Sequence, residues 1–443
     1  MNKEECDTLK RIESDSFGQV EIEDKILYGI QTIRTLQNMS FSNKALSNYP
    51  EYLKTIASVK LAAAKVNYSE KLIPLEKYNA IVYACREIQA GKYADQFPID
   101  VFHGGGGIGI NMNVNEVLTS LANHQLQYSI SKVHPIDDLN LSQSTADVCG
   151  TTSRVTIFKS ITQLLTKLNL LIEAFNHKAN QFTNVVTMSR TCLQDALPLG
   201  FSDFIGGYIE LLKRRSTSLE NSIQPLLEVN LGGTVIGTGH GASEFYRKNI
   251  VDNLRGETNL PLQLNKNLID SAQNIDLFID VSNQITQLSH AYLKIAKDLR
   301  ILASGPFGGF NELKLPAVQH GSSFFPGKIN PVIPETVIQC ALQVIGLQRS
   351  IHGALEHAEL NLNVFESYAV FNILDQITYM LNITDIFRTK CIEGIQVNEQ
   401  RCAELVNSPI PYLTRLKEKI GYTNVNELLK KHSLDEIKSM KLI

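Results

Sequence analysis

The chain has 443 residues, 43% hydrophobic and 20% charged, which is the composition of an ordinary soluble protein with room for two or three domains. Its 42 basic and 45 acidic side chains leave a net charge of -3, so charge gives no reason to expect nucleic acid or an anionic membrane as a partner. Seven cysteines without a CxxC pair argue against a disulfide framework or a zinc site and favour a reducing cytoplasm. The charged N-terminus does not look like a signal peptide, and no apolar run approaches the length of a membrane span.

The N-terminal region predicts a small, mostly helical first domain. Residues 11–38 combine a short alternating stretch, a turn and then a helical pattern, which indicates a small mixed segment. Residues 51–68 and 76–91 have apolar side chains at helical spacing. We therefore assign residues 1–143 to an N-terminal domain built mainly of helices.

A glycine-rich segment lies at 103–116, with the sequence HGGGGIGINMNVNE. Four consecutive glycines require a positive φ or a close backbone approach somewhere in the run, and the asparagines that follow can bond the local backbone. A phosphate-binding loop is one interpretation. The segment lacks, however, the GKS or GKT ending and a preceding strand.

A polar cluster occupies 133–147, VHPIDDLNLSQSTAD, and precedes a long helical pattern. Ser, Thr and Asp are preferred N-cap residues, so one interpretation is a loop followed by a helix cap. The other is a row of hydroxyl donors at a helix N-terminus that can hold a carboxylate. The residues alone leave both interpretations open.

From about residue 154 to 389 the pattern is predominantly helical. Two stretches have apolar residues at steps of three and four, and the second continues for more than three heptads. The first stretch contains Ile157, Ile161, Leu164, Leu165, Leu168, Ile172 and Phe175, and the second contains Phe278, Val281, Ile285, Leu288, Tyr292, Ile295, Leu299 and Leu302. With further helical patterns at 203–221, 335–352 and 364–389, the sequence predicts a bundle of about five long helices at 144–389, whose excess apolar surface predicts assembly with other copies.

The most informative loop is at 321–335, GSSFFPGKINPVIPE. Glycines, two adjacent serines and one lysine stand between two prolines, which predicts a mobile loop with hydroxyl groups beside a fixed cation. The helix expected after it also favours anions at its start, so the loop suits an anionic substrate. The loops at 189–198 and 232–239 would, on their residues alone, be turns, and residues 390–443 predict a short helical C-terminal domain.

Several of these segments closely resemble the aspartase/fumarase superfamily, in its order and spacing. The loop 321–331 resembles the signature G-S-S-x-M-P-x-K-x-N, and 103–116 resembles G-x-G-T-x-x-N-M-N-x-N-E-V. The remaining matches are 142–147 to S-Q-S-T-N-D, 189–198 to G-R-T-H/Q-L-Q-D-A-x-P, 232–239 to G-A/G-T-A-x-G-T-G, and 11–34 to R-x-E-x-D-x-x-G followed by Y-x-G-x-Q-T-x-R. The resemblance covers nearly the whole chain and is closest to the aspartate ammonia-lyase branch.

The resemblance implies a mainly α, three-domain fold whose central bundle assembles into the twenty-helix core of a homotetramer, with active sites shared between subunits. It implies anti elimination from an aspartate or N-substituted aspartate through an aci-carboxylate intermediate, giving fumarate, with Ser322 as the base and Lys328 as the second catalytic residue. Such chemistry depends on donors aimed at the charge that develops on a carboxylate. The residues implied to hold the carboxylates are Ser144, Thr145 and Ser323 at one end, and Thr191, Lys328 and Asn330 at the other.

Four positions depart from the family pattern. Three positions that resemble leaving-group contacts have lost polarity, namely threonine to Ile108, asparagine to Ala146, and His or Gln to Cys192, while the loop methionine is Phe325. An ammonium or water needs hydrogen-bond partners, and an unpaired buried polar group costs about 1–3 kcal/mol. We therefore expect a departing group that is larger or less polar than ammonia, such as an N-substituted amine.

Two alternatives stay open at this point. One is a fumarate hydratase acting on malate, although the Ser-Thr pair at 144 and 145 favours the aspartase branch. The other is an inactive scaffold of the superfamily, which the polar losses favour and the retained Ser322, Lys328 and Asn330 oppose. His240, His290 and His352 lack metal-ligand spacing, His134 resembles part of an accessory anion site, and no cofactor or metal is implied.

Overall fold

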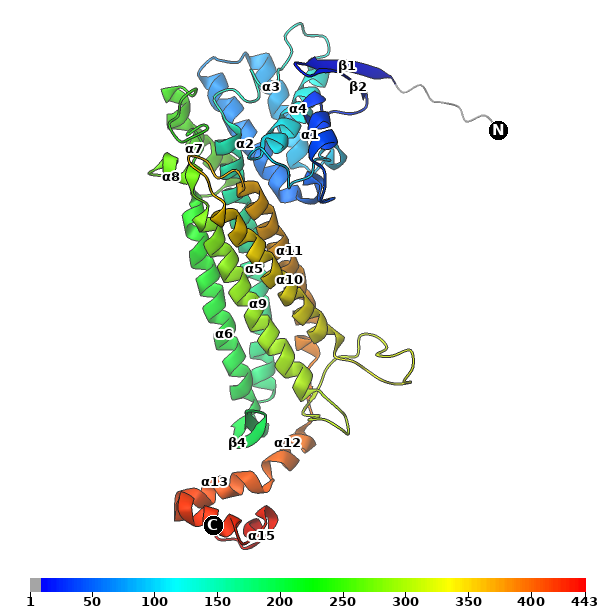
Figure 1. The fold of residues 1–443 in the computed structure, drawn as a ribbon, viewed down its shortest axis with the longest axis vertical. Helices are drawn as coiled ribbons and strands as arrows, with labels where there is room; N and C mark the ends of the chain where they lie inside the picture. The colour runs from blue at the N-terminus through cyan, green and yellow to red at the C-terminus, as the bar shows by residue number, and fades with distance from the viewer. Residues whose placement is uncertain (1–8) are drawn as a thin grey trace, which may run out of the picture. The chain divides into compact units, whose positions relative to one another are not determined.

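The computed structural model describes residues 9–443, and Figure 1 shows its elements in chain order. Cys6 and the beginning of the charged N-terminus lie outside the described residues. The chain is mainly helical, as predicted, and its described part divides into two compact units. Within the described residues, the first comprises the chain up to Thr162, Leu219–Gln284 and Gly346–Ile377, and the second comprises Gln163–Ser218, Ile285–Ile345 and Thr378–Ile443. The three-domain division stays a prediction.

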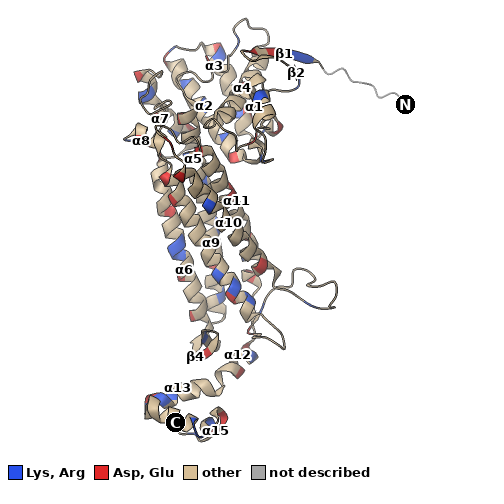
Figure 2. Cartoon of the chain, viewed as in Figure 1, with Lys and Arg blue, Asp and Glu red and all other residues tan. Residues whose placement is uncertain are grey.

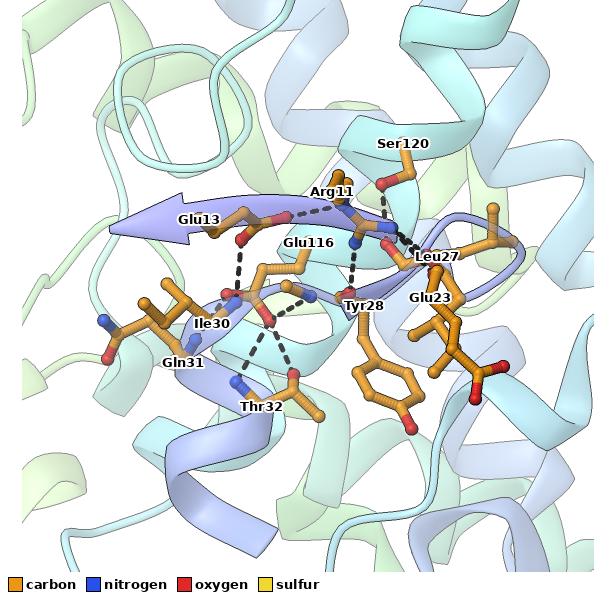
Figure 3. A network of polar contacts seen from close by, with 12 residues as sticks. Arg11, Glu13, Glu23, Leu27, Tyr28, Ile30, Gln31, Thr32, Glu116 and Ser120 are labelled. Carbon is orange, nitrogen blue, oxygen red and sulfur yellow. Dashed lines mark hydrogen bonds and ion pairs between the residues drawn. The ribbon is translucent and has the colours of Figure 1, made fainter. Parts of the chain in front are cut away.

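The mixed segment near the N-terminus is a hairpin followed by a helix. Strands β1 (Lys10–Asp15) and β2 (Gly18–Glu23) pair antiparallel, and α1 spans Ile30–Met39. The N-cap residue Gly29 has no side chain to satisfy the first helical N–H groups, so the buried carboxylate of Glu116 takes that role. It accepts hydrogen bonds from Gly29 N (2.9 Å), Gln31 N (2.9 Å) and the Thr32 hydroxyl (2.6 Å). Figure 3 shows Glu116 beside Gln31 and Thr32.

The predicted helices of the first domain are confirmed. Helix α2 spans Pro50–Ser69, with Pro at its first position, and α3 spans Leu75–Gln89. Helix α4 (Ile108–Gln125) begins inside the glycine-rich segment, directly after Gly107. The first unit also contains α7 (Glu244–Thr258), α8 (Leu268–Gln273), the parallel pair β5 (Glu228–Val229) and β6 (Gln263–Leu264), and the short 3-10 helices Leu46–Asn48, Ala94–Gln96 and Gln224–Leu227.

The five long helices predicted for the centre of the chain are present in the described residues. They are α5 (Thr145–Gln181), α6 (Phe201–Ile223), α9 (Asp276–Leu302), α10 (Val332–Glu356) and α11 (Glu366–Lys390). The apolar stripe predicted on α9 is buried from Phe278 to Leu299, while Leu302 is half-buried. Polar bonds cross between these helices within each unit, for example Ser282 to Gln376 (2.9 Å) in the first and Tyr208 to Asp298 (2.7 Å) in the second.

Helix α5 is long and apolar enough to cross a membrane by length and composition alone, a test that core helices also pass. Half of its most apolar window is buried inside the protein, as in the core helix of a globular protein. Its buried Arg154 donates to the Ser271 hydroxyl (3.0 Å) and lies over the ring of Phe278 at 5.2 Å. The ribbon of Figure 2, coloured by residue type, shows basic and acidic residues intermixed over the described chain.

The loop at 189–198 is a β-hairpin, so the turn expected there is confined to its tip. Strands β3 (Val186–Thr191) and β4 (Gln194–Gly200) pair antiparallel with a register shift between Met188 and Arg190. Cys192 and Leu193 form the tip with φ of 53° and 61°. Non-glycine residues rarely adopt this left-handed region, and the sequence therefore gives little sign of the hairpin.

The C-terminal region is helical, as predicted, and belongs to the second unit. It contains α12 (Glu399–Val406), α13 (Pro409–Ile420), α14 (Tyr422–Leu429) and α15 (Leu434–Ser439), preceded by the 3-10 helix Ile392–Gly394 and the antiparallel pair β7 (Leu313–Lys314) and β8 (Gln396–Val397). Tyr412, Leu416, Val425 and Ile437 form its small core.

Candidate active site

The hydroxyl row, Ser144 and Thr145, stands where α5 begins, as the cap pattern predicted. Both side chains are half-buried. Ser144 Oγ accepts from the backbone N–H of Ala146 (3.3 Å), and Thr145 Oγ1 accepts from Asn111 Nδ2 of α4 (3.1 Å). The helix dipole at this terminus favours a bound anion.

The glycine-rich segment brings α4 against the hydroxyl row. Gly105, Gly106 and Gly107 all have positive φ, between 61° and 89°. A Cβ at Gly107 would lie 3.3 Å from Cys149 Sγ and 3.7 Å from Thr145 Cγ2, so a glycine lets the two elements approach. Ile108, the residue that replaces the family threonine, follows directly and is 43% exposed.

A cavity of about 630 Å³ lies on the same segment. Its wall includes Gly104, Gly105, Phe102, His357, Phe365 and Tyr368. The Cγ2 atom of Ile108 would be 2.9 Å from a Cβ at Gly105, so the Ile108 side chain lies against a glycine of this wall. The cavity is therefore mainly apolar and adjoins one of the substituted positions.

Asp147 holds the start of α5 to the loop at 232–239. Its buried carboxylate accepts from the backbone N–H of Ser144 (2.8 Å), Gly232 (3.0 Å) and Thr234 (3.1 Å). Burial raises the pKa of Asp147 to about 6, and the three N–H donors oppose that rise. The resemblance included this aspartate in its motif but gave it no role.

The serine loop, 321–331, lies just before α10 and carries the predicted base, Ser322, which is half-buried. Ser322 Oγ accepts hydrogen bonds from the backbone N–H of Phe324 and of Phe325, each at 3.0 Å. Gly327 has φ of 76°, which fits the turn predicted for this sequence. The rings of Phe324 and Phe325 contact each other edge to face at 4.8 Å and are 80% and 57% exposed.

The two ends of the serine loop are held together by one backbone hydrogen bond and one side-chain hydrogen bond. Gly321 N donates to Lys328 O (2.8 Å), and Asn330 Nδ2 donates to Gly321 O (2.7 Å). Lys328 Nζ lies 5.6 Å from the centre of the Phe325 ring. Lys328 and Asn330 line a cavity of about 1210 Å³, together with Arg300 and Lys314. The sequence-predicted cation and amide thus lie together within the second unit.

The β3–β4 hairpin carries the predicted residues Thr191 and Cys192 at its exposed tip. Its strands are anchored by Glu312, whose fully buried carboxylate accepts from Thr187 and pairs with Arg190 Nη1 at 2.6 Å. The Arg190 guanidinium also lies over the Phe310 ring at 4.4 Å. A buried ion pair with this geometry fixes the hairpin and so the location of its tip.

The predicted site residues therefore divide between the two units. Ile108, Ser144, Thr145 and Ala146 belong to the first unit, and Thr191, Cys192, Ser322, Ser323, Phe325, Lys328 and Asn330 belong to the second. Two residues behind the hydroxyl row, Asn111 and Lys60, were not singled out from the sequence. Asn111 stood in the quoted motif, and the only sign of Lys60 was its location within a nearly continuous apolar stretch of α2.

The remaining candidates have ordinary surroundings. His352 Nε2 lies 3.0 Å from Asn283 Oδ1, and the exposed His134 accepts from the backbone N–H of Ile136 and Asp137. Among the described residues no group of three or more His, Cys, Asp or Glu is arranged to hold a metal ion. The six cysteines from Cys85 to Cys402 are free thiols.

Known proteins resemble this chain over most of its length. The family model for lyases matches residues 18–346, which is more than half of the chain. An aspartate ammonia-lyase of Helicobacter pylori is 38% identical over 415 residues, covering 93% of this chain and 89% of that protein. The aspartate ammonia-lyase of Escherichia coli K12 is 36% identical over 419 residues, covering 94% and 87%.

Solved structures give the same answer for the fold. A fumarate lyase:delta crystallin protein from Brucella melitensis is 37% identical, with a TM-score of 0.93 over 98% of this chain and 96% of that one. A class II fumarase from Schistosoma mansoni is 28% identical, also with a TM-score of 0.93 over 98% and 96%. The chain is thus an enzyme that belongs to the lyase family, within the aspartase/fumarase superfamily.

Proposed function

We propose that the protein is an aspartase-like carbon–nitrogen lyase that eliminates an amine from an aspartate or N-substituted aspartate in the anti sense and gives fumarate. Ser322 removes the proton beside one carboxylate, and an aci-carboxylate forms before the carbon–nitrogen bond breaks. The proton taken by Ser322 and the departing amine balance the new double bond.

One observation carries the proposal, namely the two backbone N–H groups that point at Ser322 Oγ from Phe324 and Phe325 at 3.0 Å. Serine alone is too weak an acid to act as a base near neutral pH. Donors already aimed at the oxygen stabilise the negative charge of an alkoxide and so lower the cost of forming one.

The two ends of the substrate need different partners. In the proposal, Ser144, Thr145 and Ser323 hold the carboxylate on which charge develops. Thr191, Lys328 and Asn330 hold the other one. The helix start at the hydroxyl row and the single ammonium of the serine loop both favour anions, which supports this division.

The leaving group is expected to be an N-substituted amine. Ile108, Ala146 and Cys192 offer no strong hydrogen-bond partner to an ammonium. The apolar cavity of about 630 Å³ whose wall contacts Ile108 provides volume for a substituent. Plain aspartate and malate are then poorer substrates than aspartates with a substituent on nitrogen.

Assembly into a homotetramer completes the proposal, since the site residues are divided between the two units. A site that takes the hydroxyl row from one subunit and the serine loop from another combines the predicted residues of the first unit with those of the second. Free cysteines throughout the described chain suit a reducing cytoplasm, where we expect the enzyme to work.

The test is a substrate panel monitored by the absorbance of fumarate. Wild-type protein is mixed with aspartate, malate and a series of N-alkyl and N-aryl aspartates, and in the reverse direction with fumarate and each amine. We expect the highest kcat/KM with an N-substituted aspartate. A rate confined to malate would instead establish the hydratase, and a rate confined to plain aspartate would reject the substituted leaving group.

The matched variants are Ser322→Ala and Ser439→Ala, an exposed serine of α15 in the same unit. Loss of a positioned general base lowers kcat by about 10²–10⁴-fold, while removal of one hydroxyl outside the core changes stability little. We expect the first variant to lose activity at unchanged thermal midpoint and the second to keep it. Equal activity of Ser322→Ala and wild type would remove Ser322 as the base.

A further inference from the structure

Lys60 is a lysine in the interior of the first unit. It lies in the middle of α2, is 1% exposed, and donates from Nζ to Asn140 Oδ1 at 3.0 Å. Lysine is seldom buried unless its ammonium has a partner. The amide oxygen of Asn140 is that partner. Asn140 is in turn connected by hydrogen bonds to the hydroxyl row.

Asn140 Oδ1 collects three donors. Besides Lys60, it accepts from Asn111 Nδ2 (3.0 Å) and Asn115 Nδ2 (3.3 Å), both buried on α4. Its own Nδ2 donates to the backbone oxygen of Gln143 (3.3 Å). An ammonium can only donate, so it holds the oxygen of the Asn140 amide toward itself and excludes the flipped amide.

The orientation is passed on to Thr145. Because Asn140 presents an oxygen, Asn111 must present its NH₂ group, and the same Nδ2 donates to Thr145 Oγ1 at 3.1 Å. A hydroxyl that accepts on this side keeps its own proton for a bond elsewhere. With Asn111 flipped, its oxygen would instead attract that proton away from a ligand.

We propose that Lys60 is a positioning residue which, through Asn140 and Asn111, keeps the Thr145 hydroxyl oriented as a donor toward a bound carboxylate. The inference rests on the proposed function, because it names what controls the carboxylate-binding end of that same site. It assigns Lys60 no contact with substrate.

The surroundings of Lys60 make its charge responsive near neutral pH. Burial lowers the pKa of Lys60 to about 7, while Cys149 and Asp147 on α5 and Cys85 on α3 raise it by smaller amounts. Burial also raises the pKa of both thiols to about 12, so they are neutral here.

The other titratable groups change little across this range. Asp147 has its pKa at about 6, and the buried Tyr246 of α7, which faces Asp147, has a pKa raised well above the usual value. On α4 the groups facing Lys60 are amides. Above pH 6.5, Lys60 is thus the member of this cluster whose charge changes most, and Asp147 completes its ionisation at the lower end of the range.

The experiment measures fumarate binding by calorimetry between pH 6.5 and 8.5, since fumarate itself does not titrate in that range. The wild type is compared with Lys60→Met, Lys60→Gln and the control Lys65→Met, which changes an exposed lysine five residues along the same helix. Wild type and the control are expected to bind at least threefold more weakly at pH 8.5 than at pH 6.5.

The variants distinguish positioning from packing. Lys60→Met is expected to bind at least tenfold more weakly at pH 6.5, with a flat pH profile. Lys60→Gln can donate but cannot titrate, so it is expected to recover part of the affinity, also with a flat profile. A flat wild-type profile, or a slope that persists in Lys60→Gln, would overturn the inference even if Lys60→Met failed to fold.

Failure of the proposed function is distinguishable. Wild-type protein that neither binds fumarate nor releases it from any aspartate rejects the proposed function, and this inference with it. Normal turnover whose pH profile is unchanged in Lys60→Gln rejects only the role of Lys60.

Discussion

Lys60 couples the stability of the fold to pH with a sign opposite to that of a surface lysine such as Lys92, whose pKa is raised by its partner Glu87. Its pKa is about 7 in the folded chain against 10.5 for an ordinary lysine. Between these values the unfolded chain holds the proton more tightly, so the free energy of unfolding rises with pH by up to about 1.4 kcal/mol per pH unit. Below pH 7 both states are protonated and the dependence ends.

The prediction is a difference between two proteins. The free energy of unfolding of wild type minus that of Lys60→Met is expected to increase from pH 7 to pH 9, as measured by urea denaturation at one protein concentration. Lys65→Met, whose lysine is exposed, serves as the control and is expected to show no such increase. A difference that is constant with pH would mean that Lys60 titrates normally.

Individual residues of the candidate site differ in how well the sequence predicts them. Ser322, Lys328 and Asn330 stand within ten residues, so one motif identifies the whole group. The roles of Lys60 and Asp147 depend on partners far along the chain, Asn140 in one case and the loop at Gly232 in the other. Local patterns contain no information about such contacts, and these residues become visible only in the folded protein.

At the scale of elements, the geometry of the serine loop depends on Gly321. A Cβ there would lie 2.5 Å from the Lys328 carbonyl oxygen and 2.7 Å from Asn330 N, which is closer than real atoms approach. Any side chain at position 321 must therefore push the two ends of the loop apart and move Lys328.

Gly321→Ala is expected to lower kcat/KM by at least tenfold while the thermal midpoint stays within about 2 °C of wild type, because the loop is exposed and contributes little to the core. Gly308→Ala is the matched control, since a Cβ at Gly308 meets nothing within 4 Å. Steady-state kinetics and a melting curve on each protein decide the matter. Unchanged kinetics in Gly321→Ala would show that activity does not depend on the two ends of the loop staying in contact.

The elements also explain where prediction from sequence works. The long helices were found because apolar stripes such as that of α9 recur over many turns, and a repeated signal outweighs local exceptions. The hairpin at 186–200 was missed because its tip uses Cys192 and Leu193 in a left-handed conformation that usually requires glycine or asparagine. Contacts of Arg190 with Glu312 and Phe310 hold the hairpin in place, and these contacts are invisible locally.

At the scale of the whole molecule, the proposed assembly predicts complementation between inactive variants. Ser322→Ala alters the serine loop, and Thr145→Val alters the hydroxyl row. If each site takes these two residues from different subunits, random mixing gives about one quarter of the sites both native residues.

Co-expression of the two variants with different affinity tags, followed by isolation of the mixed oligomers, tests this prediction. We expect activity of up to about one quarter of wild type in the mixed oligomers and almost none in either variant alone. Mixed oligomers as inactive as their parents would mean that one subunit supplies both residues.

The path of the five long helices has a practical consequence for anyone who wishes to divide this protein. Each of them contributes residues to both compact units, and each unit is therefore collected from three separate stretches of chain. No single continuous fragment contains either unit without long stretches of the other, so genes truncated to one unit would encode severed helices with bare apolar stripes. Dissecting the enzyme by cloning its halves is expected to yield insoluble polypeptides, and point substitutions are the workable route.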